Sequence, residues 1–212
     1  MSLPIHHQVA PRPRDLQPLA GDLTLLRGRL HEVCGPSRIR LAAGVMARSE
    51  GPVVWIRPGW GPERLNVAGL QPLANPARLI LVRADRDESA LWAAEEALRS
   101  GAAPLVVVET AALPGLTPVR RLHRAAGAGA ETAHQGGAVP PLGLLLTPGQ
   151  GGAPGVESRW HMAPLPSRGL LWSDEAAWVL TRLRARLAPP ARWRLGRKDD
   201  APETLDRLSP EP

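Results

Sequence analysis

The chain contains no phenylalanine, no tyrosine, one cysteine and one lysine among its 212 residues. Because Cys34 is the only cysteine, an internal disulfide and a metal site built from several cysteines are excluded, and a reducing compartment fits. No apolar run approaches the roughly 20 residues that span a bilayer, and the first residues lack the apolar core of a secretion signal. We therefore expect a cytoplasmic protein with no membrane contact.

Arginine supplies almost all of the positive charge. The net charge is +6, Lys198 is the only lysine, and tryptophan alone represents the large aromatic residues. Arginine binds phosphates and carboxylates in planar, bidentate geometry, so this charge suits a nucleic-acid or an acidic protein partner. The same bias, together with abundant alanine, glycine and proline, is typical of a GC-rich genome, so composition selects no partner by itself.

The order of apolar patterns along the chain predicts an α/β protein with a mostly parallel central sheet and helices on both faces. Short apolar runs predict strands, and apolar residues three or four positions apart predict helices. The expected strands are 27–35, 52–57, 78–83, 104–109 and 142–147, and the expected helices are 37–51, 61–70, 87–101 and 117–133. Strands that alternate with helices in this way form parallel sheets covered by the helices.

The pattern changes after residue 147, where antiparallel C-terminal strands are expected. Residues 158–165 predict one strand, and a period of two in residues 177–187 predicts a second, half-exposed one. That period places three arginines on one face of the strand: Arg182, Arg184 and Arg186. A partner strand follows Pro189-Pro190.

The two ends of the chain carry little periodicity. Four prolines among residues 1–22 predict an irregular N-terminal arm, and residues 196–212, with few apolar groups, predict a disordered tail. The core domain is therefore expected to span residues 23–195.

Several segments follow the order and spacing of RecA-family cores. They include Gly28-Arg29-Leu30, Glu32, Gly35-Pro36, "VVWIR", "ALWAAEEALRSG", "LVVVE" and "ESRW". Over about residues 27–195 the chain resembles the ImuA family, RecA-like accessory proteins of the bacterial SOS mutagenesis cassette. The resemblance implies a RecA-like core and a role in SOS-induced DNA repair and translesion synthesis.

The stretch "HEVCGPSRIRLAAG" (31–44) stands where this resemblance places a nucleotide loop. A phosphate loop needs glycines, a lysine for the β- and γ-phosphates and a Ser or Thr for Mg²⁺. Here the loop is about three residues short and has no Gly-Lys-Thr. Its degenerate positions are Gly35, Pro36, Ser37, Arg38 and Arg40. Glu109 stands where the resemblance places a magnesium-orienting acid, and Gly59 replaces the catalytic carboxylate, so we expect no ATP hydrolysis, no cofactor and no metal.

DNA contact is expected to be weak or indirect. The segments that match the DNA-contacting loops of RecA are 112–116, which is very short, and 148–157, which lacks a basic residue. A DNA or partner surface would instead use one of two arginine clusters. These are Arg120, Arg121 and Arg124 on a helix, and Arg182, Arg184 and Arg186 on a strand. Tryptophans that interleave with the second cluster suit either base stacking or core packing; they are Trp160, Trp172, Trp178 and Trp193.

The leading hypothesis is a non-catalytic, RecA-like adaptor. The resemblance implies an ImuB-like Y-family polymerase-like partner, with RecA and an error-prone replicative-type polymerase as further partners. Three alternatives stay open: a residual nucleotide-dependent ATPase rebuilt around its arginines, a SulA-like inhibitor of cell division, and a DNA-binding module.

Overall fold

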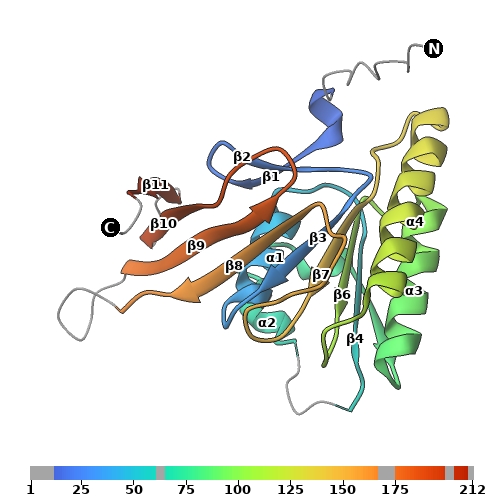
Figure 1. Ribbon diagram of the computed structural model, residues 1–212, viewed down its shortest axis with the longest axis horizontal. Helices are drawn as coiled ribbons and strands as arrows, with labels where there is room; N and C mark the ends of the chain where they lie inside the picture. The colour runs from blue at the N-terminus through green and yellow to red at the C-terminus, as the bar shows by residue number, and fades with distance from the viewer. Residues whose placement is uncertain (1–11, 61–64, 167–174, 199–202, 210–212) are drawn as a thin grey trace, which may run out of the picture.

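A nine-stranded sheet forms the centre of the computed structural model, which describes residues 12–60, 65–166, 175–198 and 203–209. Its strands are β3 (Leu30–Cys34), β4 (Val53–Pro58), β5 (Leu79–Ala84), β6 (Leu105–Glu109), β7 (Leu142–Leu146), β8 (Ser158–Pro164), β9 (Glu175–Ala185), β10 (Ala191–Lys198) and β11 (Thr204–Leu208). The order across the sheet is β11-β10-β9-β8-β3-β7-β6-β4-β5 (Figure 1). The strands from β8 to β5 are parallel, and β9, β10 and β11 add antiparallel pairs. The predicted α/β class, with antiparallel C-terminal strands, is confirmed.

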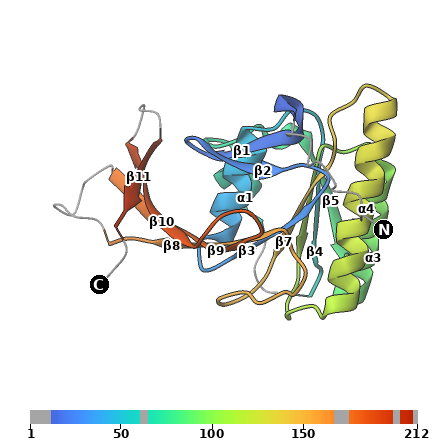
Figure 2. The same ribbon diagram turned by 45° about the horizontal axis from the view of Figure 1, so that its top comes forward.

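Helices cover both faces of the parallel strands. The helix α1 (Arg38–Ala47) packs against β3, β7 and β8 on one face, while α3 (Asp87–Ser100) and α4 (Leu116–Gln135) pack side by side on the other (Figure 2). The short helix α2 (Val67–Leu70) and the 3₁₀ turn η2 (Pro76–Arg78) lie in the connection between β4 and β5.

Burial on both faces explains why β6 is apolar at successive positions. In β6, Leu105 and Val107 belong to the core on the α1 side, whereas Val106 and Val108 belong to the core beneath α3 and α4. Successive side chains of a strand point to opposite faces, so a strand between two helical layers needs apolar residues throughout.

The expected helix 61–70 is much shorter in the structure. Only α2 is helical, and Asn66 begins it by accepting a hydrogen bond from the N–H of Gly69. Residues 61–64 lie outside the described residues. The expected helix 37–51 also ends early, at Ala47, because Gly51 turns the chain with φ +74° into β4.

The irregular arm predicted over residues 1–22 is wrong for its second half. After a 3₁₀ turn, η1 (Pro13–Asp15), the chain forms a hairpin of β1 (Leu16–Ala20) and β2 (Leu23–Leu26). Leu19 packs against the α1 side of the core, and the side-chain amide of Gln17 donates to the carbonyl of Arg48 at 3.0 Å. Tertiary contacts thus order a proline-rich segment, and Pro18 is tolerated because a two-stranded ladder leaves an edge position for it. Residues 1–11 lie outside the described residues.

The disordered tail predicted over residues 196–212 is also wrong in part. Strand β10 continues to Lys198, and β11 pairs with it through five residue pairs. Leu205 of β11 fills the space under the turn at Gly21, where an added Cβ would lie 2.9 Å from the Leu205 side chain. Few apolar residues suffice to hold β11 in place, because Glu203 forms ion pairs with Arg40 of α1 and with Arg48 in addition to the backbone pairing of β11 with β10. Residues 199–202 and 210–212 lie outside the described residues.

Helices α3 and α4 cross at Gly129, and this contact generates a prediction about stability. A Cβ at Gly129 would lie 1.9 Å from the carbonyl oxygen of Leu98, so Gly129→Ala must push the helices apart. We expect a loss of about 2–4 kcal/mol in the free energy of unfolding, measured with urea.

Gly127 provides the matched control on the same helix. The nearest atom to a Cβ there is 4.0 Å away, so Gly127→Ala should be neutral or stabilise by about 0.5–1 kcal/mol. Equal effects of the two substitutions would contradict the close crossing.

Candidate functional site

The degenerate loop follows β3 at the carboxyl edge of the parallel strands, where open α/β sheets place their ligands. Gly35 has φ +90°, and a Cβ there would lie 2.5 Å from the carbonyl oxygen of Met162. Strand β8 therefore runs directly against the loop, and only glycine fits at this position.

The backbone donors of this loop are bonded to the protein itself. The N–H of Gly35 donates to the carbonyl of Gly149 at 2.9 Å, and the N–H of Ser37 donates to the carbonyl of Met162 at 3.0 Å. The N–H of Arg38 donates back to Gly35 at 3.2 Å, and Pro36 has no N–H. A phosphate cradle depends on converging N–H groups that a ligand can reach, so this geometry leaves few of them for a phosphate.

Arg40, one of the two arginines of the loop, is held by contacts within the protein. Arg38 begins α1, and the Arg40 guanidinium lies 4.9 Å above the ring of Trp178. Arg40 and Arg48 both form ion pairs with Glu203, the residue that precedes β11. Burial opposes ionisation of Glu203, but hydrogen bonds from the two arginines outweigh it and lower its pKa. Arg40 thus fastens the C-terminal strands to α1.

Glu109, the expected counterpart of a magnesium-orienting acid, ends β6. Its carboxylate accepts a hydrogen bond of 2.6 Å from Nε1 of Trp55, a side chain buried in β4. Strand β7 lies between β6 and β3, so Glu109 and the degenerate loop stand on strands that are not neighbours.

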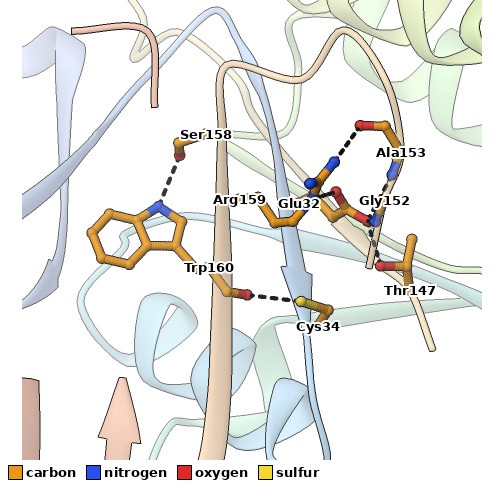
Figure 3. Close-up of polar contacts among 8 residues, drawn as sticks. All are labelled: Glu32, Cys34, Thr147, Gly152, Ala153, Ser158, Arg159 and Trp160. Atoms are coloured by element: carbon orange, nitrogen blue, oxygen red, sulfur yellow. Dashed lines mark hydrogen bonds and ion pairs between the residues drawn. The ribbon is translucent and has the colours of Figure 1, made fainter. Parts of the chain in front are cut away.

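A buried carboxylate that the sequence reasoning did not single out as a site lies beside the loop, in the middle of β3. Glu32 is fully buried and accepts hydrogen bonds from Thr147 Oγ1 at 2.7 Å, the N–H of Gly152 at 2.8 Å and the N–H of Ala153 at 3.1 Å (Figure 3). Arg159 of β8 forms an ion pair with it and also donates to the carbonyl of Ala153 at 3.0 Å. The carboxylate is therefore saturated by one side chain from each neighbouring strand and by a loop.

This arrangement gives the glycine-rich loop 148–157 a structural role. Gly151 has φ +71°, and a Cβ there would lie 2.7 Å from Oε1 of Glu32, so the loop can fold over the carboxylate only with glycine. A sequence signal for the cluster existed, because Glu32 places a charge in the short strand between Leu30 and Val33. A charge at a doubly covered strand position needs partners.

A second series of buried hydrogen bonds begins at His31, on the same strand. His31 Nε2 donates to the carbonyl of Leu26 at 2.9 Å, which leaves Nδ1 to accept from the Ser158 hydroxyl at 2.7 Å. Ser158 in turn accepts from Nε1 of Trp160 at 2.8 Å (Figure 3). Each group has a partner when the imidazole is neutral. Burial lowers the pKa of His31 to about 4; the hydrogen bond to Leu26 opposes this shift, and the charges of His123, when protonated, and Arg29 add to it.

The helix cluster of arginines splits into different environments. All three are exposed on α4, but Arg121 forms an ion pair of 2.6 Å with Glu95 of α3, which Arg99 also contacts. Arg121 therefore contributes to the helix pair, while Arg120 and Arg124 face solvent.

The strand cluster does not share one face, so that prediction is wrong. In the ladder between β8 and β9, Arg184 pairs with Arg159 and Arg182 pairs with Trp160, which leaves Leu183 as an extra residue. Arg159 and Trp160 are adjacent and point to opposite faces, so their partners do as well. Arg186 follows β9, and its side chain lies 3.5 Å from Glu157. A β-bulge thus divides the cluster.

The tryptophans near this cluster belong mainly to the core. Trp160 and Trp193 are buried, with ring centroids 5.8 Å apart, and Trp178 is half-buried beneath Arg40. Trp172 lies outside the described residues. Core packing, rather than base stacking, is therefore the role of the first two.

Metal and thiol chemistry find no support in the part of the chain that the structure describes. Within it, no group of three or more His, Cys, Asp or Glu residues could hold a metal ion. Burial, followed by the charge of Glu32, raises the pKa of the Cys34 thiol to about 12, so the thiolate is suppressed. Among the same described residues, the helices are too short or too polar to cross a membrane.

Comparisons with known proteins add little to this geometry. No family model matches the chain, and no curated protein matches it. Among solved structures, it is similar to the crystal structure of SulA from Pseudomonas aeruginosa, with a TM-score of 0.43 and 22% sequence identity. That similarity covers 57% of this chain and 98% of the other. We base no functional argument on a similarity of this strength.

The Glu32 cluster generates a prediction about stability. Glu32→Gln removes the negative charge and leaves the mostly buried Arg159 guanidinium without its counter-ion. We expect a loss of about 3 kcal/mol in the free energy of unfolding, because breaking one partner of a buried pair exposes the desolvation cost of the other. The exposed Glu50 gives the control, and Glu50→Gln should change stability by less than about 0.5 kcal/mol.

A double substitution tests whether the charge pair is responsible. Adding Arg159→Met to Glu32→Gln removes the unpaired cation, so the combined loss should be smaller than the sum of the two single losses. Additive losses in urea unfolding would contradict the pair.

His31 generates a prediction about pH. The unfolded imidazole takes up a proton near pH 6.5, but the folded one does so only near pH 4, so stability is complete above pH 6.5 and falls as the pH drops toward 4. His31 alone should account for about 3 kcal/mol of that loss. Urea unfolding at several pH values should therefore give a shallower decline for His31→Gln than for the unchanged protein. An unchanged slope would contradict the assignment.

Proposed function

We propose that this chain is a non-catalytic, RecA-like adaptor of the ImuA type, acting in SOS-induced DNA repair and translesion mutagenesis. Its principal partner would be an ImuB-like Y-family polymerase-like protein, with RecA and an error-prone replicative-type polymerase as further partners. The sequence resemblance supplies the partners in this proposal, and the geometry of the protein supplies the reasons for an adaptor.

The position of the degenerate loop supports the non-catalytic part. Its N–H groups at Gly35 and Ser37 are used by carbonyls of the protein, and Arg40 is held by Glu203. Binding a nucleotide there would require breaking these bonds and finding a replacement for the missing lysine. Glu32, the acid nearest the loop, is already saturated by four donors.

The free edge of β5 supports the adaptor part most directly. β5 is the last strand of the sheet, and no described segment pairs with its outer side. Ile80 is 52% exposed and Leu81 is 47% exposed, and these neighbours point to opposite faces. Natural sheets usually protect an edge with charges, prolines or bulges. β5 carries one exposed charge near its end, Arg83, but the apolar stretch of Ile80 and Leu81 before it favours pairing with another chain.

Addition of a partner strand explains how such an edge could recognise a protein. Backbone hydrogen bonds along β5 would give affinity, and Ile80 and Leu81 would cover apolar side chains of the partner on both faces of the sheet.

Capture of the partner tests the proposal. A tagged ImuB-like protein from the same organism should retain this chain, and the double substitution I80K/L81K should weaken retention by about tenfold or more, since it places charges on an apolar interface. Leu187→Lys is the control, because Leu187 is 81% exposed at the turn between β9 and β10, away from β5. It should leave capture unchanged.

A nucleotide arm of the same experiment tests the non-catalytic part. Capture in the presence of Mg²⁺ and ATP should match capture without them. Failure of the folded chain to bind the partner at all would remove the adaptor role, whereas capture that depends on ATP would instead favour the ATPase alternative.

A further inference from the structure

The three C-terminal strands gather arginines into one groove of about 280 Å³. Arg182 of β9, Arg192 of β10 and Arg207 of β11 line it, together with Thr181 and Ser209. No carboxylate of the described residues lines this groove. These strands extend the sheet away from α3 and α4, so the groove lies far from those helices (Figure 2).

Arg182 is fixed in place by the protein. Its guanidinium lies 5.2 Å above the ring of Trp193 and 5.7 Å above the ring of Trp160, and its Nε donates to the carbonyl of Pro189 at 2.9 Å. Stacking on two buried rings holds the planar group in one orientation. The terminal nitrogens therefore project from a rigid base instead of a flexible side chain.

Arg207 brings a second positive charge to the same face. It pairs with Trp193 across the ladder between β10 and β11, so its side chain emerges on the side where Arg182 stacks. Burial, and after it the charge of Arg207, lower the pKa of Arg182. The positive charge of Arg182 is therefore not fully stabilised by its surroundings. An anion between the two guanidinium groups would remove that cost.

Among the residues that the structure describes, the acids on and next to β11 do not face Arg182 and Arg207. Asp206 is opposite Arg194 in the ladder, and both alternate with Arg207 and Trp193 onto the opposite face of the sheet. Glu203 forms ion pairs with Arg40 of α1 and with Arg48, the residue after α1. Within the described residues, no acid is thus placed to neutralise Arg182 and Arg207, which suits an outside anion.

We propose that the groove between Arg182 and Arg207 binds the phosphodiester backbone of single-stranded nucleic acid. Guanidinium groups only donate hydrogen bonds, so the ligand should present acceptors. A phosphodiester chain does this at every unit, whereas a peptide brings an N–H donor with almost every carbonyl. The site is distinct from the edge of β5 and does not depend on the adaptor role.

The buried tryptophans define what kind of binding this is. Trp160 and Trp193 are 2% and 6% exposed, so bases cannot stack on them, and the contacts are to phosphates. The groove size suits one backbone unit of a single strand. Binding should therefore be independent of sequence and strongly dependent on salt.

Fluorescence anisotropy with a labelled oligo-dT of 30 nucleotides tests the site on the full chain. Arg207→Gln should weaken binding by about fivefold and reduce the slope of log K against log salt by about 0.7, the value for one phosphate contact on a single strand. Arg207→Lys keeps the charge but loses the planar guanidinium group, so its affinity should lie between that of the unchanged protein and that of Arg207→Gln. Arg14→Gln is the matched control, since Arg14 is exposed on η1 and its loss changes the net charge equally.

Three results would overturn the proposal. The first is no measurable binding of the oligonucleotide at 50 mM salt. The second is an equal loss for Arg207→Gln and Arg14→Gln, which would mean that only net charge matters. The third is equal competition by a polyglutamate peptide of matched charge, which would assign the groove to an acidic protein. Partner capture through β5 would be unaffected by any of them.

Discussion

The ion pair of Glu32 and Arg159 organises the centre of this protein. It joins β3 to β8, and the same carboxylate holds Thr147 and the backbone of the loop 148–157. A fully buried charge is costly, so every neighbouring element must meet it with a donor, and the loop has no freedom to turn elsewhere. Next to β3, the loop where open α/β sheets place ligands is therefore bonded to the protein itself. The two surfaces proposed for partners lie at the two ends of the sheet, at β5 and at the C-terminal strands.

Most of the fold could be predicted from the sequence, because the central strands are covered on both faces. Uniformly apolar strands such as β6 and β7 and an amphipathic helix such as α3 leave one interpretation. The errors lie where long-range contacts decide. Nothing local in the segment around Pro18 indicates that the Gln17 side chain will hydrogen-bond to the end of α1. Likewise, nothing in "APETLDRL" indicates that Glu203 will form ion pairs with two arginines that precede it by more than 150 residues.

The candidate site was predicted less well. The sequence predicts a turn after the strand that the structure shows as β3, but it cannot show that the N–H groups of Gly35 and Ser37 are bonded internally, since their acceptors are carbonyls of distant segments. A period of two predicts one face for Arg182, Arg184 and Arg186 only along an unbroken ladder. One extra residue, Leu183, reverses that alternation. The position of such a β-bulge cannot be predicted from the residue types of the strand. Arg207 was overlooked because it lies in a segment that seemed too polar to fold.

The position of β3 also has a consequence for synthesis on the ribosome. β3 is among the first strands made, yet its neighbours β7 and β8 come from the later half of the chain, and Arg159 follows Glu32 by 127 residues. Loop-closure entropy makes such pairings slow to form. During translation β3 must wait, with apolar side chains and a carboxylate uncovered, while β4, β5 and β6 are completed first. Co-translational chaperone contact should therefore concentrate on this early segment.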